Sequence, residues 1–409
     1  MGDFRGFAPK RRKSSDRGAE LEVRCVCPRV KRFGMEVKMI ELHGGDIYRN
    51  HVEYDFSVNV NPLGMPEGSV RAAQEAILHS ARYPDWRGEA LCRAIAEAEG
   101  VEAEWILPGN GAAELIYGIC AAVRGCGAER HKRGPSGGTA AFTGMMSAPS
   151  FQEYEAAVSA AGGEALFWNL SEKEGFVLTE GILGMIEEEK PDVLFLCNPA
   201  NPTGLLTGKN LLLQIIETCE RTGTWFCLDE CFLPFLEQEG ALSLKRECAG
   251  YPHLIVLRAF TKIYGMPGLR LGYAVSANAS FRERLRRCLP PWNTSLPAQM
   301  AGIAALSDRA YLKRTRVLIE EEKRRLMEGM EEGLAEQIIG HAANFLFFRG
   351  RRDLKERMLE QGILIRSCAD FRNLGEGYFR IGIRTREENE ELLRRWRAIE
   401  GKCTAAAKG

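Results

Sequence analysis

Apolar runs of strand length alternate with longer amphipathic segments along most of this chain, and this alternation restricts the folds open to it. A strand buried in a parallel sheet is apolar along its whole length, and the helices that connect such strands cover the sheet. In Ala112–Val123 an apolar residue recurs every four positions, as in a helix. The pattern predicts an α/β fold whose large domain has three layers around a mostly parallel sheet. The runs are Trp105–Leu107, Met145–Ser147, Ala165–Trp168, Val193–Cys197, Trp225–Leu228, Leu254–Leu257 and Leu271–Val275.

The pattern changes after about residue 290 to that of a smaller α+β domain. A long helix is predicted over Ala310–Gly333. Its Glu320–Arg324 and Glu321–Arg325 pairs, at four-residue spacing, indicate a solvated face. Two short strands are expected next, and then a last helix that begins with the capping box Thr385-x-x-Glu388.

The first 38 residues differ from the rest of the chain because they are basic and show no amphipathic period. They are expected to form a disordered tail, or to precede a true start at Met35 or Met39. The expected division is a tail over 1–38, a large domain over 67–288, a small domain from 39–66 and 289–401, and a flexible end over 402–409.

Composition excludes several classes of protein. The 409 residues include 55 Lys and Arg and 55 Asp and Glu, so the net charge is zero, whereas a dedicated nucleic-acid-binding protein normally carries a basic excess. No apolar run reaches the roughly 18 residues of a membrane span, and no signal peptide is recognised. The 13 cysteines are scattered, mostly within apolar runs, as in a reducing compartment. We therefore expect a cytoplasmic protein that binds neither nucleic acid nor membranes, and we expect no metal site.

Three loops carry candidate functional residues beside predicted strands. Small residues in Pro108–Glu114, before a helix, suit the binding of an anion such as phosphate, although such turns are often only structural. The two Asn-Pro steps in Asn198–Gly204 hold polar side chains at a strand end, or simply make the loop rigid. Asp229 ends another apolar strand, where α/β proteins place ligands, or it is an exposed loop acid.

A fourth candidate is Lys262, which follows the strand Leu254–Leu257 among apolar neighbours. Desolvation in such a setting lowers the pKa of a lysine and makes its amine nucleophilic. A single lysine in a loop is usually a surface residue, but this one is followed by Gly268 and Arg270.

Four elements follow one another in the chain: the glycine turn, the Asn-Pro-Ala-Asn-Pro-Thr-Gly loop, Asp229, and the segment Thr-Lys-Ile-Tyr-Gly-Met-Pro-Gly-Leu-Arg that ends at Arg270. In this order they resemble the fold-type-I pyridoxal-phosphate enzymes, the superfamily of class I and II aminotransferases. The resemblance extends from about His43 to Glu400. It implies that Lys262 forms the Schiff base with pyridoxal 5′-phosphate and that Asp229 pairs with the pyridine nitrogen. The other implied cofactor contacts are Asn201 at the ring hydroxyl, Phe151 stacked on the ring, Gly111, Ala112, Ala113 and Arg270 at the phosphate, Thr261, and Tyr83 from the neighbouring subunit of a homodimer.

Two positions depart from the pattern of this superfamily. Ala259 stands where a Ser or Thr often contacts the phosphate, and Phe232 stands where a Tyr often reaches the ring hydroxyl. Each loss removes one hydrogen bond to a charged group, worth about 1.5–3 kcal/mol. The expected result is weaker or electronically altered cofactor binding.

Within the superfamily, His43-Gly-Gly, the segment Asp55–Gly64 and Pro290-Pro-Trp-Asn resemble the threonine-phosphate decarboxylase family, with histidinol-phosphate aminotransferases as near relatives. The decarboxylase family converts L-threonine O-3-phosphate to aminopropanol phosphate and carbon dioxide in cobalamin assembly. By this match Arg380 would bind the α-carboxylate, Arg366 the carboxylate or the phosphate, and His43 the phosphate, with Asn201 as a further substrate contact.

Two alternatives to a decarboxylase follow from the same residues. An aminotransferase that passes an amino group to 2-oxoglutarate would share the fold and most contacts. A non-catalytic regulator with an aminotransferase-like body would need an N-terminal DNA-binding domain, for which 38 irregular residues are too few. The presence of both Lys262 and Asp229 also favours an enzyme.

Overall fold

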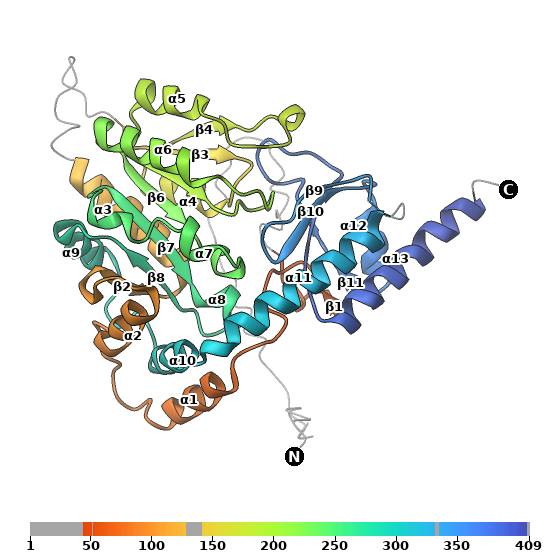
Figure 1. The fold of residues 1–409 in the computed structure, drawn as a ribbon, viewed down its shortest axis with the longest axis horizontal. Coiled ribbons are helices and arrows are strands. Elements are labelled where there is room, and N and C mark those ends of the chain that lie inside the picture. Colours follow the sequence, from red (N-terminus) through yellow and green to blue (C-terminus); the bar gives the residue numbers. More distant parts are fainter. Residues whose placement is uncertain (1–43, 51, 128–140, 332–334, 407–409) are drawn as a thin grey trace, which may run out of the picture. The chain divides into compact units, whose positions relative to one another are not determined.

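Each of the seven apolar runs forms a strand, and the seven strands make one sheet (Figure 1). The computed structural model describes residues 44–50, 52–127, 141–331 and 335–406. β8 pairs antiparallel with both of its neighbours, and the other pairs are parallel. In sheet order the strands are β2 (Ile106–Gly109), β8 (Gly272–Val275), β7 (Leu254–Ala259), β6 (Trp225–Asp229), β5 (Val193–Cys197), β3 (Thr143–Ala148) and β4 (Glu164–Asn169).

Helices cover both faces of this sheet, because the connections reverse direction within it. α3 (Gly111–Gly127) and α4 (Glu153–Ala160) lead toward the β4 edge, whereas α5 (Gly181–Glu189) and α6 (Lys209–Thr222) lead back toward β6. Right-handed crossovers place the two pairs of helices on opposite faces. The contacts agree, since α3 packs on α4 and α5 packs on α6. The predicted three-layer α/β architecture is confirmed.

A small antiparallel sheet forms in the C-terminal third, in the order β12 (Arg366–Ser367), β13 (Tyr378–Gly382), β10 (Phe345–Arg349) and β9 (Gln337–Gly340). β1 (Tyr54–Asp55) pairs in parallel with β11 (Ile363–Leu364), so a segment that precedes the large sheet lies beside C-terminal residues. The α+β character of this region is thereby confirmed, but the expectation of two short strands is wrong, because five strands lie between residues 337 and 382. The domain boundaries stay a prediction.

The long helix predicted from residue 310 is α11 (Arg309–Glu331). Two ion pairs on this helix join residues three apart rather than four: Lys323 Nζ lies 3.2 Å from Glu320, and Arg325 Nε lies 3.5 Å from Glu322. Glu322 is buried and also binds Arg386, 3.2 Å away on the last helix, α13 (Arg386–Ala406). Glu320, Glu321 and Arg324 are exposed, as expected of a solvated face, whereas the contact of Glu322 with a residue 64 positions away could not be predicted from the sequence pattern.

The capping box at the start of α13 is confirmed: Glu388 Oε2 accepts from the Thr385 N–H at 3.1 Å, and the Glu388 N–H donates to Thr385 Oγ1 at 3.4 Å. Within the described residues, no helix is both long and apolar enough to cross a membrane. The remaining α-helices are α1 (Glu67–Leu78), α2 (Glu89–Glu99), α7 (Glu239–Leu242), α8 (Phe260–Ile263), α9 (Ala279–Cys288), α10 (Leu296–Ser307) and α12 (Leu354–Glu360).

The strand order also locates a binding crevice. β3 and β5 are neighbours, but the chain leaves β3 toward one edge of the sheet and leaves β5 toward the other. The carboxyl ends of two such strands leave a crevice between their loops, and ligands of open α/β sheets bind there. The loops that begin at Pro149 and Asn198 flank this point.

Candidate active site

A cavity of about 470 Å³, called here the active-site cavity, lies at the carboxyl ends of β3, β5, β6 and β7. Residues of the small antiparallel sheet close its other side. Of the residues predicted from the sequence, it is lined by Ala112, Ala113, Phe151, Asn201, Asp229, Thr261, Lys262, Arg270, Arg366 and Arg380. Segments up to about 270 positions apart in the sequence therefore line one cavity.

Lys262 lies in the short helix α8, directly after β7, and lines the cavity. Desolvation by the surrounding protein, followed by the positive charge of Arg380, lowers the pKa of its amine to about 8. An ordinary lysine is almost wholly protonated near neutral pH, whereas the lowered pKa leaves a larger fraction of the Lys262 amine in its neutral form. A neutral amine is the form that attacks an aldehyde.

Asp229 ends β6, is buried, and is held by two hydrogen bonds. The hydroxyl of Tyr154 donates to Oδ2 at 2.8 Å, and the N–H of Cys231 donates to Oδ1 at 2.9 Å. Tyr154 itself is fully buried and stacks on Phe195 at 5.1 Å between ring centroids. Sequence reasoning missed Tyr154, although its place three residues after Phe151, one helical turn away, could have suggested it.

Replacing Tyr154 with Phe tests this contact, because the ring keeps its stacking and loses only the donor. We expect cofactor affinity and kcat/KM each to fall about 10-fold, the cost of one hydrogen bond to a charged group. Titration of the apo-protein with pyridoxal phosphate and steady-state kinetics measure the two effects. Unchanged values for both would show that Cys231 alone holds Asp229.

The glycine turn before α3 forms a cradle beside Arg270. Gly111 has φ +79°, which favours glycine, and a Cβ there would lie 2.6 Å from Arg270 Nη2 and displace the guanidinium. Arg270 itself has φ +58°. Ala112 and Ala113 follow Gly111 in the first turn of α3 and line the cavity. Backbone N–H groups at a helix start and one guanidinium are suited to hold a phosphate.

Two further arginines reach the cavity from the small sheet. Arg380 is buried, donates from Nη1 to Asn201 Oδ1, and donates from Nη2 to the Ser57 carbonyl at 3.2 Å. Burial lowers the pKa of Arg380 to about 10, yet the group stays protonated at neutral pH. Arg366 is also buried and forms an ion pair with Asp370 at 2.7 Å.

The two departures noted in the sequence both face this site. Ala259, the last residue of β7, and Phe232 line the cavity. Phe232 packs edge-on against Phe345, with ring centroids 5.1 Å apart, so its ring belongs to an aromatic cluster. An apolar wall therefore stands where a tyrosine hydroxyl would otherwise be.

Among the described residues, Tyr83 is a predicted cofactor contact that this chain does not bring to the cavity. Tyr83 is 79% exposed, stacks on Trp292 at 4.6 Å and does not line the cavity. His43 lies outside the described residues. Within the described residues, no cluster of side chains suits a metal ion.

Comparison with known proteins places this site in a family. The model of aminotransferase class I and II matches residues 53–395. The chain is 37% identical to the threonine-phosphate decarboxylase of Salmonella typhimurium, an alignment covering 83% of this chain and 89% of that protein. It is 31% identical to the histidinol-phosphate aminotransferase of Moorella thermoacetica, covering 83% and 84% of the two chains.

Solved structures agree with the sequence relatives. The crystal structure of the histidinol-phosphate aminotransferase from Clostridium acetobutylicum has a TM-score of 0.76 and 26% identity to this chain, covering 85% of this chain and 99% of that one. The family model spans the large sheet, the cavity and the small sheet. The chain therefore belongs to the class I and II aminotransferase family, whose enzymes depend on pyridoxal phosphate.

Proposed function

We propose that the protein decarboxylates L-threonine O-3-phosphate to (R)-1-amino-2-propanol phosphate and carbon dioxide, as a step in cobalamin biosynthesis. The main structural support is the placement of two buried arginines, Arg366 and Arg380, in one cavity with Lys262. A substrate with both a carboxylate and a phosphate suits two guanidinium groups. The 37% identity to a threonine-phosphate decarboxylase supports the same substrate.

The cavity offers a partner for each functional group of pyridoxal 5′-phosphate, which is the proposed cofactor. Arg270 and the first turn of α3 would hold the phosphate, and Asp229 would accept from the protonated pyridine nitrogen. Lys262 would bind the aldehyde carbon, and Phe151 would cover the ring. When bound, the cofactor draws electrons away from the substrate Cα.

Arg380 and Arg366 would orient the substrate for loss of its carboxylate. Arg380 is fixed by Asn201 and by the Ser57 carbonyl, so a carboxylate bound to it is held in one orientation. Cleavage of the bond from Cα to the carboxylate releases carbon dioxide, and Cα must then gain one proton. Protonated Lys262 would supply that proton from Nζ and regain one from solvent, which balances the reaction.

The decisive experiment mixes cofactor-loaded protein with L-threonine O-3-phosphate. We expect one carbon dioxide and one aminopropanol phosphate for each substrate consumed, measured by coupled carbonate detection and by mass spectrometry. Turnover of histidinol phosphate with 2-oxoglutarate, and no carbon dioxide from threonine phosphate, would instead establish an aminotransferase. The 31% identity to a histidinol-phosphate aminotransferase makes this the second candidate function.

Replacing Arg380 with Gln removes the proposed carboxylate contact and keeps a polar side chain near Asn201. We expect kcat/KM for threonine phosphate to fall about 100-fold, which corresponds to the loss of a charge-assisted hydrogen bond of about 3 kcal/mol. The substrate dependence of the initial rate measures this fall. A fall below about 3-fold would mean that Arg380 does not bind the carboxylate.

We further propose that the protein acts as a homodimer in which Tyr83 reaches the neighbouring subunit's cofactor phosphate. Tyr83 is exposed and stacks on the half-exposed Trp292, so the two rings form an aromatic pair at the surface of the chain. Light scattering that gives the mass of one chain would contradict the dimer.

A further inference from the structure

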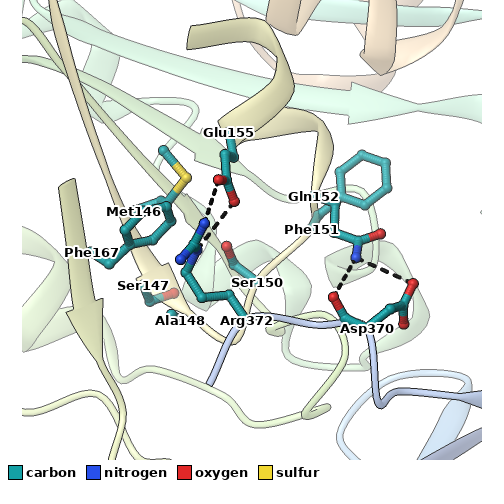
Figure 2. A pocket seen from close by; sticks show the side chains of 10 residues that line it. All are labelled: Met146, Ser147, Ala148, Ser150, Phe151, Gln152, Glu155, Phe167, Asp370 and Arg372. Carbon is teal, nitrogen blue, oxygen red and sulfur yellow. Dashed lines mark hydrogen bonds and ion pairs between the residues drawn. The ribbon is translucent and has the colours of Figure 1, made fainter. Parts of the chain in front are cut away.

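A loop beside the active-site cavity is attached to the large sheet and its helices. This loop, residues 368–373, is the first part of the connection from β12 to β13, contributes Phe371 to the cavity, and is called here the strap. Its last residue, Asn373, donates from Nδ2 to the Leu170 carbonyl at 2.7 Å and to the Ala148 carbonyl at 3.1 Å. Arg372 forms an ion pair with Glu155 of α4 at 2.5 Å. A third attachment of the strap is at Asp370, and a cavity of about 220 Å³ lies between it and the ion pair of Arg372 (Figure 2).

The attachment at Asp370 connects the strap to a substrate-binding arginine. Figure 2 shows the amide of Gln152 turned toward Asp370, where Nε2 donates to the backbone carbonyl at 2.9 Å and to Oδ2 at 3.3 Å. The same Oδ2 accepts from Arg366 Nη2 at 2.7 Å. Gln152 follows Phe151, and both line the active-site cavity. Asp370 does not line it, whereas Arg366 does.

The Arg366 guanidinium is held by more than this one oxygen. Nη1 donates to the Ser367 carbonyl at 2.8 Å, and the group lies 5.2 Å from the ring centroid of Phe371, which lines the cavity. The plane of an arginine must be fixed for its N–H groups to meet two oxygens of an anion together. These contacts fix the plane of Arg366 before substrate arrives.

We propose that Asp370 is a positioning residue that orients Arg366 toward the second anionic group of the substrate, and so contributes to selectivity for phosphorylated amino acids. The proposal rests on the proposed function, in which Arg366 binds that group. Asp370 also carries a negative charge, which by itself would oppose anion binding. Orientation outweighs this repulsion because the Arg366 guanidinium lies 2.7 Å from the carboxylate and offsets much of its field.

Three variants of the cofactor-loaded protein separate the effect of orientation from that of charge. They are Asp370→Ala, Asp370→Asn and the control Arg372→Gln. The Ala variant removes both the oxygen and the charge, and the Asn variant keeps an oxygen acceptor in the same place. The control breaks the other ion pair of the strap and leaves Arg366 untouched. KM and kcat are measured with L-threonine O-3-phosphate. Binding of this compound and of L-threonine is also measured, from the change in visible absorbance of the bound cofactor.

For Asp370→Ala we expect the KM and the dissociation constant for threonine phosphate to rise about 10- to 100-fold, with kcat and L-threonine binding each changed less than about 3-fold. The Asn variant should recover much of the loss, and Arg372→Gln should not separate the two ligands. Tighter or unchanged binding of threonine phosphate to the Ala variant would overturn the proposal. An equal loss for both ligands would also overturn it, because that result indicates a structural role.

Because binding is read without turnover, the selectivity change is measurable even if the protein does not decarboxylate threonine phosphate. A selectivity change without carbon dioxide release would refute the proposed function and retain the role of Asp370. Should Asp370→Ala fail to fold, Asp370→Ser is measured in its place, because its hydroxyl fills part of the space and leaves Arg366 without the carboxylate. The same expected and contradicting results apply to it.

Discussion

Replacement of Lys262 with Ala should reduce kcat by about 10⁴-fold or more, which is the largest effect we expect from any single change in catalysis. The amine would attach the cofactor, and it is the group that would return a proton to Cα. Both roles are lost with the side chain. Steady-state kinetics measure the loss, and the visible absorbance of the bound cofactor should shift because the attachment is gone.

A suitable control is Lys209→Ala, which removes a half-buried amine that pairs with Glu247 at 2.5 Å, away from the active-site cavity. Its kcat should stay within about 3-fold of the unmodified protein. Retention of more than about 1% of the activity in Lys262→Ala would exclude the assigned role.

The lowered pKa of Lys262 gives a pH dependence with a definite sign. Its amine is neutral above about pH 8 in the folded apo-protein, whereas an ordinary lysine becomes neutral only near pH 10.5. Borohydride trapping of pyridoxal phosphate should therefore rise with pH, level off above about 8, and modify the Lys262 peptide first. Unfolding takes up a proton between these two values, so the amine's contribution to stability increases with pH across that window. A trapping profile that still rises steeply at pH 9–10 would contradict the shift.

The sequence predicted the sheet well because burial on both faces leaves a local signal. All seven apolar runs became strands, and Val193–Cys197 matches its strand end to end. Some strands extend past the predicted apolar run and end at a polar or small residue, such as Asp229 in β6 and Ala259 in β7. At these ends, hydrogen bonding to a neighbouring strand decides the boundary. Such pairing is a property of the fold rather than of a short window of sequence.

The site was predicted where a motif is local, and missed where a contact is long-range. Lys262, Asp229 and Arg270 lie within short motifs, and all three line the cavity. Tyr154 and Asp229 are 75 positions apart, and Gln152 and Asp370 are 218 apart. Neither contact follows from spacing or composition. Only the fold brings residues at the start of α4 beside the end of β6 and beside the segment that follows β12.

The sequence analysis also did not predict a cluster of charged side chains around Arg258 in β7. Arg258 in β7 lies beside Glu230, at 2.7 Å, and Glu239, at 2.6 Å. Lys245 binds Glu239 at 3.0 Å and Glu99 at 2.5 Å. Desolvation opposes ionisation of Glu99, but the charges of Arg258 and Lys245 outweigh it and lower its pKa; those charges also lower the pKa of Glu239 to about 2. Three carboxylates thus share two basic groups.

Replacement of Arg258 with Met should lower the free energy of unfolding by about 3–5 kcal/mol at neutral pH. The methionine fills the space, but the buried Glu230 and the partly buried Glu99 and Glu239 then face one lysine, and burial makes an unpaired charge costly. Urea unfolding of the cofactor-loaded protein measures the change. The exposed pair of Arg221 and Glu187 supplies the control, since Arg221→Met should cost less than about 1 kcal/mol.

The pH dependence and a double variant separate charge from packing in this result. The lowered pKa values of Glu99 and Glu239 contribute to stability at pH values above the ordinary pKa of a glutamate, about 4.5. This contribution is lost as the pH falls from about 4.5 toward 2. The difference between Arg258→Met and the unmodified protein should therefore shrink over that range. Adding Glu230→Gln to Arg258→Met removes one of the three carboxylates and should recover much of the stability. A deficit that persists at low pH, where the carboxylates are protonated and no longer repel one another, and also in the double variant, would show that Arg258 acts through packing instead.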